Sequence, residues 1–90
     1  MRAVRVVVHG WVQGVGFRAH VMRRAVELGV SGWVRNLADG GVEAEAAGEE
    51  RALRAFVEAM RSGPVGARVR EATEQWFETA AAPQGFHLER

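Results

Sequence analysis

Several residue types are absent from this chain of 90 residues, and each absence excludes a class of chemistry. Cysteine is missing, which excludes a disulfide scaffold, a thiolate metal site and a cysteine nucleophile. Lysine is missing too, since all twelve basic residues are arginine, so a Walker-type phosphate loop and Schiff-base catalysis are excluded. The only aspartate is Asp39, which excludes phosphatases built on paired aspartates and most carboxylate-rich Mg²⁺ sites.

The chain also has no long apolar run and almost no net charge. Its apolar stretches are too short to span a bilayer, and no signal-peptide pattern opens the sequence, so we expect no membrane partner. With 12 basic and 11 acidic residues the net charge is +1, which provides no broad positive field for nucleic acid. The absence of cysteine suits a reducing compartment, and we expect a cytoplasmic protein without a nucleic-acid partner.

The composition that remains is typical of one folded domain. Hydrophobic residues make up 48% of the chain and charged residues 26%, which is ordinary for a globular protein and excludes disorder. A chain of 90 residues can form one core without metal or disulfide support. We therefore expect a single domain over residues 1–90, and a monomer.

Alternation of apolar and polar residues predicts the strands. The valines at positions 4, 6 and 8 give the clearest pattern, in a strand from about Ala3 to Trp11. The weakest pattern lies between residues 69 and 78, where Glu74 interrupts the apolar face. The expected strands cover residues 3–11, 30–37, 42–46, 69–78 and 86–88, with a hairpin turn at 39–41.

Helical spacing predicts two amphipathic helices. The first ends at Gly29 and places Val21, Met22, Ala25 and Val26 on one side. The second runs from about Glu49 to Ser62, where apolar residues recur at i, i+3, i+4 and i+7. The order of elements predicts an α+β fold, the ferredoxin-like split βαβ sandwich, with an antiparallel sheet of four to five strands and both helices on one face.

Few residues remain that can carry catalytic chemistry. The histidines form neither an i, i+4 pair nor a close cluster with carboxylates, so we expect no metal site at His9, His20 or His87. Neither serine lies in a G-x-S-x-G nucleophile elbow. Glu43 and Glu45 share one strand face, and alternate glutamates there are expected to form its solvated side rather than an acid–base pair.

The segment with the strongest chemical signal is the glycine loop, residues 12–18, between the first strand and the first helix. Gly14 and Gly16 give the backbone access to conformations closed to other residues, so successive N–H groups can point toward one place. The helix N-terminus adds partial positive charge, and Arg18 offers a planar fork of donors suited to phosphate oxygens. These features favour an anion site, although an ordinary strand-to-helix turn has the same residues.

Asn36 is the only asparagine in the chain, and it shares a strand face with Val30 and Val34. This parity places it on the helix-covered side, near the end of the strand. In a split βαβ sandwich a right-handed crossover returns the chain near the glycine loop, so the Asn36 amide can point at an anion held by Arg18. The alternative, that Asn36 only begins the following turn, remains open from residue type alone.

Two motifs in the chain resemble the signatures of the acylphosphatase family. Residues 10–18 read G-W-V-Q-G-V-G-F-R and match the family's first signature, G-x-V-Q-G-V-x-F-R. Residues 32–36 read G-W-V-R-N and, together with Gly40, Val42 and Gly48, fill every position of the second. Two long motifs at the correct separation are specific. The resemblance covers the whole chain, and the C-terminal third contributes least to it.

The resemblance implies the ferredoxin-like fold and an enzyme that hydrolyses the carboxyl-phosphate bond of small acyl phosphates without cofactor or metal. The family's phosphate-binding arginine corresponds to Arg18, and its water-positioning asparagine to Asn36. One departure is Leu37, because some members have a hydroxyl residue directly after the asparagine. The other site residues that the resemblance implies bind the phosphoryl group through backbone amides: Gln13, Gly14, Val15, Gly16 and Phe17.

Acyl phosphates need little catalytic machinery. Their leaving group is a carboxylate, whose conjugate acid has a pKa of about 4, so it departs without a general acid. A loose transition state spreads charge over the phosphoryl oxygens, and positioning with electrostatic stabilisation supplies most of the catalysis. A chain without a base, a nucleophile or a metal ligand set is therefore sufficient for this reaction.

Three alternatives to this function remain from the sequence, and one of them is a module that binds an anion without catalysis. A similar domain processes carbamoyl phosphate within a larger carbamoyl-transfer protein, but we expect a free-standing domain because the chain shows no zinc finger. Ferredoxin-like sandwiches also include RNA-binding modules that stack bases on sheet aromatics, for which Trp11, Trp33 and Trp76 are the candidates. The aromatic-rich RNA signature is missing and the net charge is only +1, so acyl phosphate hydrolysis is favoured.

Overall fold

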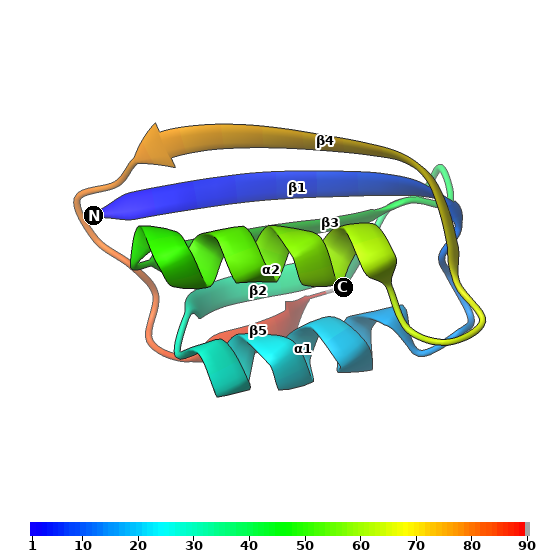
Figure 1. Ribbon diagram of the computed structural model, residues 1–90, viewed down its shortest axis with the longest axis horizontal. Helices are drawn as coiled ribbons and strands as arrows, with labels where there is room; N and C mark the ends of the chain where they lie inside the picture. The colour runs from blue at the N-terminus through cyan, green and yellow to red at the C-terminus, as the bar shows by residue number, and fades with distance from the viewer. Residues whose placement is uncertain (90) are drawn as a thin grey trace.

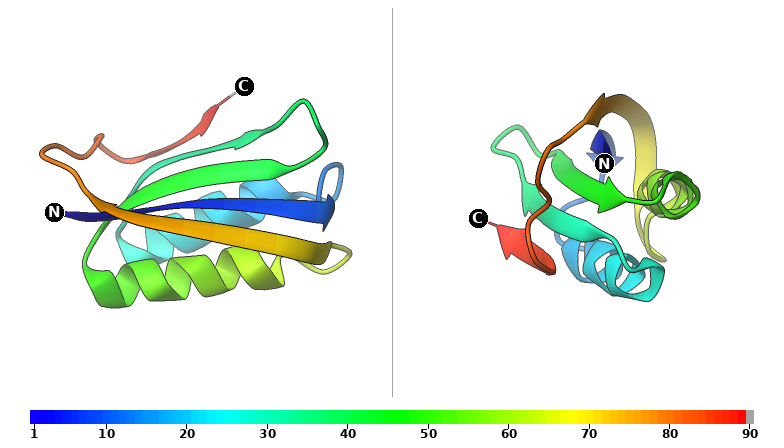
Figure 2. Two further views of the ribbon diagram at one scale, coloured as in Figure 1. Left: turned by 90° about the horizontal axis from the view of Figure 1, so that it is seen from above. Right: turned by 90° about the vertical axis from the view of Figure 1, so that its left-hand side faces the viewer.

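A computed structural model describes residues 1–89, which form a five-stranded sheet with two helices packed on one face (Figures 1 and 2). The elements follow the chain as β1 (Arg2–Trp11), α1 (Phe17–Leu28), β2 (Ser31–Asn36), β3 (Val42–Gly48), α2 (Glu50–Ser62), β4 (Arg68–Glu78) and β5 (Phe86–Glu89). The strand order across the sheet is β4-β1-β3-β2-β5. Neither helix among the described residues is long and apolar enough to cross a membrane.

The predicted ferredoxin-like fold is confirmed, with one difference in the sheet. The sheet is mixed rather than antiparallel, because β5 pairs with β2 in the parallel direction. The cause is the path of the chain after β4, which crosses one end of the sheet and turns back on the far edge (Figure 2). A strand that runs opposite to β4 at that edge has the same direction as β2.

The core lies between the sheet and the helices. The alternating valines of β1, Val4, Val6 and Val8, are fully buried there. Leu53, Phe56 and Met60 of α2 are fully buried against them, as the helical spacing predicted. Burial of these side chains supplies the main driving force for folding, at roughly 1.5–3 kcal/mol for each large apolar side chain.

One prediction about which side chains face the core is wrong. Val26 of α1 was expected on the buried side, but it is 69% exposed, because only the side that carries Val21 and Ala25 reaches the sheet. Glu74 does interrupt the apolar face of β4, where it is exposed between the half-buried Ala72 and Trp76. It accepts hydrogen bonds there from Arg61 and from the Trp76 indole, both at 2.9 Å. These two donors hold the pKa of Glu74 below its ordinary value, with the indole the larger cause.

The sheet topology brings the C-terminal ends of two strands to the same end of the sheet. β1 and β2 each pair antiparallel with β3, so β1 and β2 run in the same direction and finish at the same end of the sheet. β1 ends at Trp11 and leads into the glycine loop, and β2 ends at Asn36. The two segments with the strongest chemical signals in the sequence therefore meet, at the end where α1 begins (Figure 1).

Candidate functional site

A cavity of about 240 Å³ lies at the end of the sheet where β1 and β2 terminate. It brings together five of the residues predicted for the site: Gly14, Gly16, Phe17, Arg18 and Asn36. The other lining residues are Val12, Ala19 and Leu88. Gln13 and Val15, also predicted for the site, belong to the loop but do not line the cavity, and Val15 packs against the hydrophobic core.

Both glycines of the loop adopt backbone conformations that favour glycine. The φ angles are 78° at Gly14 and 77° at Gly16, in the left-handed region. A Cβ atom built at either position would meet no other atom within 4 Å. Glycine is therefore needed here for the direction of the backbone and not for lack of space. That direction decides where the neighbouring N–H groups point.

The N–H groups of the loop are not used by the rest of the described chain. None of those from residues 13–18 donates to a backbone carbonyl among residues 1–89, and the first to do so in α1 is His20 N–H, 3.0 Å from the Gly16 carbonyl oxygen. Gly16 caps the helix without a side-chain hydrogen bond, and the first turn contains no acidic residue. The positive end of the helix dipole is thus uncompensated within residues 1–89, an arrangement that attracts an anion.

Of the described residues, Arg18 supplies the one charged side chain that lines the cavity. It is half-buried, and its Nη1 donates to the Glu89 carbonyl oxygen over 3.4 Å, a long and weak contact. No carboxylate of residues 1–89 forms an ion pair with Arg18. The arginines that do form such pairs within this range are Arg2, Arg5, Arg24, Arg35, Arg54 and Arg61. The Arg18 guanidinium therefore retains donors for an anion.

Asn36 lies across the cavity, as the last residue of β2, where it pairs with Val42 of β3. Its side chain is half-buried and makes no hydrogen bond with another of the residues 1–89. The turn that follows is capped by Asp39 instead, whose Oδ1 accepts the Gly41 N–H at 3.0 Å. The alternative that Asn36 merely begins the turn loses its support, since the side chain that holds the turn is Asp39.

Sequence reasoning missed three contacts around the site. Leu88 of β5 lines the cavity and is 49% exposed, and nothing in so short a strand indicated its position. His9 Nε2 lies 3.0 Å from Asp39 Oδ2 although the sequence showed no such pairing. The Gly41 N–H and then His9 lower the pKa of Asp39. The third contact is made by the side chain of Gln13, which donates to the turn after β2.

Comparisons with a family model, with curated proteins and with solved structures bear on the family of this chain. The family model described as Acylphosphatase matches residues 4–88, a span that includes every residue lining the cavity. An acylphosphatase of Salinibacter ruber is 48% identical over 81 residues, which is 90% of this chain and 85% of that protein. An acylphosphatase of Rhizobium etli is 45% identical over 86 residues, 96% and 92% of the two chains. The crystal structure of acylphosphatase from Bacillus subtilis is similar with a TM-score of 0.96 and 37% identity, covering 100% of both chains.

Proposed function

Because this chain belongs to the acylphosphatase family and is an enzyme that hydrolyses acyl phosphates, we propose that the cavity beside the glycine loop holds the phosphoryl group of the substrate. One observation carries this proposal. Arg18, Asn36 and a helix N-terminus with unused N–H groups surround the same small cavity. No carboxylate of residues 1–89 lines it to repel an anion.

The phosphoryl group is held by hydrogen bonds from the loop amides and from Arg18. Several N–H groups and a guanidinium can each donate to the three equatorial oxygens, which carry the negative charge of the transition state. Gly14 and Gly16 line the cavity and have positive φ, a backbone conformation that lets successive N–H groups converge on one anion. The donors are fixed by the fold before the substrate arrives, so little reorganisation accompanies the chemical step.

Asn36 holds the attacking water. Its carboxamide lines the cavity and has no hydrogen-bond partner among residues 1–89, so its oxygen can accept from a water and its nitrogen can donate to one. The water oxygen forms a bond to phosphorus while the bond from phosphorus to the carboxylate oxygen breaks. The water proton passes to a phosphoryl oxygen, and the products are a carboxylate and inorganic phosphate.

No protein group needs to protonate the leaving carboxylate, whose conjugate acid has a pKa of about 4. The lining residues within the described range 1–89 match this requirement, since they include no histidine, aspartate or glutamate. Leu37 follows Asn36, where some relatives are expected to have a hydroxyl, and its carbonyl oxygen accepts from Gln13. The position after Asn36 therefore contributes to this site through its backbone.

Kinetics of two alanine variants test these assignments. Arg18→Ala should reduce kcat/KM for benzoyl phosphate by at least about a hundredfold, which corresponds to about 3 kcal/mol. Arg18→Lys should recover only part of this, because a point charge cannot bridge two oxygens. Asn36→Ala should lower kcat more than it raises KM, because the water is needed in the chemical step.

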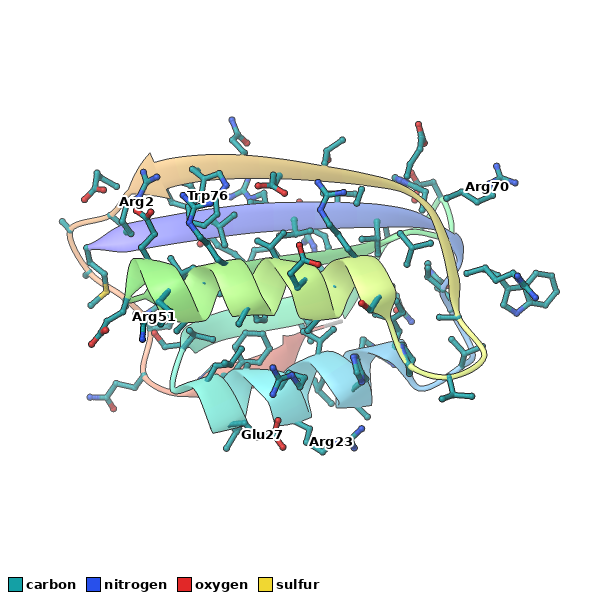
Figure 3. The ribbon with its side chains drawn as sticks, in the orientation of Figure 1. Arg2, Arg23, Glu27, Arg51, Arg70 and Trp76 are labelled. Carbon is teal, nitrogen blue, oxygen red and sulfur yellow. The ribbon has the colours of Figure 1, made fainter. Side chains whose placement is uncertain are left out.

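The control is Arg23→Ala, on the same helix. Arg23 is exposed and points away from the body of the molecule (Figure 3), so this variant removes the same charge without touching the cavity. If Arg18→Ala and Arg23→Ala turned over benzoyl phosphate equally well, Arg18 would have no role in holding the substrate. A pure KM effect in Asn36→Ala would assign this residue to substrate binding instead.

The proposal includes a monomer that works in the cytoplasm. The large exposed apolar side chains of residues 1–89 belong to different parts of the chain: Met1, Trp11, Val26, Val65 and Leu88. The absence of cysteine from the sequence fits a reducing compartment. Light scattering tests the first statement and cell fractionation the second, and a dimer mass or a periplasmic location would contradict them.

A further inference from the structure

The side chain of Gln13 connects the two halves of the cavity without lining it. Its Nε2 donates to the Leu37 carbonyl oxygen at 2.7 Å and to the Gly41 carbonyl oxygen at 2.9 Å. Both contacts are short and partly buried. Gln13 belongs to the glycine loop, and the two acceptors belong to the turn between β2 and β3. One carboxamide therefore joins the segment that carries Arg18 to the segment that follows Asn36.

The two acceptors form the base of that turn. Leu37 N–H donates to the Gly41 carbonyl oxygen at 2.8 Å, and Gly40 N–H donates to the Leu37 carbonyl oxygen at 3.2 Å. Each carbonyl thus accepts one hydrogen bond from within the turn and one from Gln13. An NH₂ group suits this position because it offers two donors in one plane. A carboxylate of the same shape offers none.

Asn36 directly precedes Leu37, the first of the two residues that accept from Gln13. Its own side chain has no hydrogen-bond partner among residues 1–89, so its place is set by the backbone on either side of it. On one side the backbone is paired within the sheet, through Asn36 and Val42. On the other side it is Leu37, whose carbonyl Gln13 holds. The distance between Asn36, which holds the water, and the glycine loop, which holds the phosphoryl group, therefore depends on Gln13.

We propose that Gln13 is a positioning residue, whose carboxamide fixes Asn36 relative to the glycine loop so that the water lies in line with the phosphorus. This inference rests on the function proposed above for Asn36. A displacement of about 1 Å between reacting groups can cost on the order of a hundredfold in rate. The two short hydrogen bonds from Gln13 to the turn limit such a displacement.

The turn has a second attachment, which keeps it folded when Gln13 is changed. His9 Nε2 lies 3.0 Å from Asp39 Oδ2, and a Cβ atom on Gly41 would lie 2.7 Å from the same His9 nitrogen. The side chains of this pair are 37% and 63% exposed, so the pair is weak. It keeps the turn against β1 but does not reach the glycine loop. Substitution of Gln13 is thus expected to loosen the site rather than unfold it.

Gln13→Glu is the sharpest test, because it keeps the shape and removes both donors. At neutral pH the carboxylate repels the two carbonyl oxygens. We expect kcat for benzoyl phosphate to fall by at least about tenfold, with a change in KM of less than about threefold. Gln13→Met removes the donors without adding charge and should change kcat in the same direction by a smaller factor. The matched control is Gln75→Glu, at an exposed position of β4, which should leave both constants within about twofold.

A double-mutant cycle with Asn36→Ala separates positioning from a general loss of structure. If Gln13 acts through Asn36, then Gln13→Glu should cost little further kcat once Asn36 is already alanine. Urea unfolding of each variant establishes that the enzyme is fully folded in the assay. An equal loss of kcat from Gln13→Glu in both backgrounds would overturn the proposal, as would wild-type kcat in both Gln13 variants.

The single variants keep this inference distinct from the proposed function. If Asn36→Ala lowers kcat and the cycle is additive, the role of Asn36 stands and only the role of Gln13 falls. If Asn36→Ala retains wild-type kcat, the role proposed for Asn36 falls and that of Gln13 falls with it. A loss of kcat in Gln13→Glu that disappears in the Asn36→Ala background supports both.

Discussion

Gly16 and Gly29 form a matched pair that tests whether the glycine loop acts through the direction of its amides. They cap the two ends of α1, with φ and ψ of 77° and 24° at Gly16 and of 72° and 24° at Gly29. A Cβ atom at either position would meet nothing within 4 Å. Alanine at either end therefore encounters the same backbone strain, about 1–2 kcal/mol for an L-residue in the left-handed region. The two variants should lose about the same free energy of unfolding, measured by urea titration.

Their kinetics should differ. Gly16 lines the cavity, whereas Gly29 lies at the far end of a helix of 12 residues, about 18 Å away. The Gly29 N–H is also already bonded within the helix end. Relief of strain at Gly16 rotates the neighbouring peptides and turns their N–H groups away from the phosphoryl oxygens. Since loss of one transition-state donor costs about 100-fold in kcat, a partial displacement in Gly16→Ala should lower kcat/KM at least about tenfold.

Gly29→Ala should keep kcat/KM within about twofold of the wild type, since its strain is remote from the chemistry. Inorganic phosphate as a competitive inhibitor provides a second readout, and its inhibition should weaken only in Gly16→Ala. If Gly16→Ala were destabilised as much as Gly29→Ala but kept wild-type turnover and phosphate inhibition, the direction of the loop amides would have no part in catalysis.

The remaining predictions concern pH, backbone packing and metal. Burial lowers the pKa of His20 from 6.5, so the native state binds fewer protons than the unfolded chain just below that pH and the free energy of unfolding should fall as the pH is lowered through about 6.5. His20→Phe should flatten that slope in urea titrations between about pH 5 and 7. A Cβ atom at Gly32 would lie 1.9 Å from the Glu45 carbonyl oxygen, so Gly32→Ala should lower the free energy of unfolding by at least about 3 kcal/mol. Gly66 has open space around it, so Gly66→Ala should lower it by only about 1–2 kcal/mol. Equal losses in the two variants would contradict the close approach of β2 and β3. Turnover of benzoyl phosphate should continue undiminished in excess EDTA, and a loss of activity that Mg²⁺ restores would contradict the metal-free mechanism.

Most of the fold was predictable because it follows from local periodicity. The alternating valines of β1 and the apolar spacing of α2 each allow only one face of the element to pack against the core. The direction of β5 was not predictable, because four residues carry no signal that distinguishes parallel from antiparallel pairing. The exposure of Val26 was missed for a related reason. The side of α1 that packs against the core is narrower than the spacing of its apolar residues suggests.

The site was predictable as a set of residue types but not as a set of contacts. Glycines before a helix and a following arginine indicate an anion site by their chemistry, and Asn36 was placed by strand parity. The side chain of Gln13 carries no such signal, because its acceptors are carbonyls 24 and 28 residues away. Leu88 comes from the opposite end of the chain. Contacts of this kind depend on the tertiary fold alone.

The central claim is that Arg18 and the loop amides bind a phosphoryl group, and phosphate binding itself tests it most directly. Calorimetric titration of inorganic phosphate into the wild type, Arg18→Ala and Arg23→Ala measures the anion site without the chemical step. Loss of a charge-assisted bond of about 1.5–3 kcal/mol weakens binding by about tenfold or more. We predict this loss for Arg18→Ala and none for Arg23→Ala. Equal affinity for phosphate in all three proteins would contradict the account.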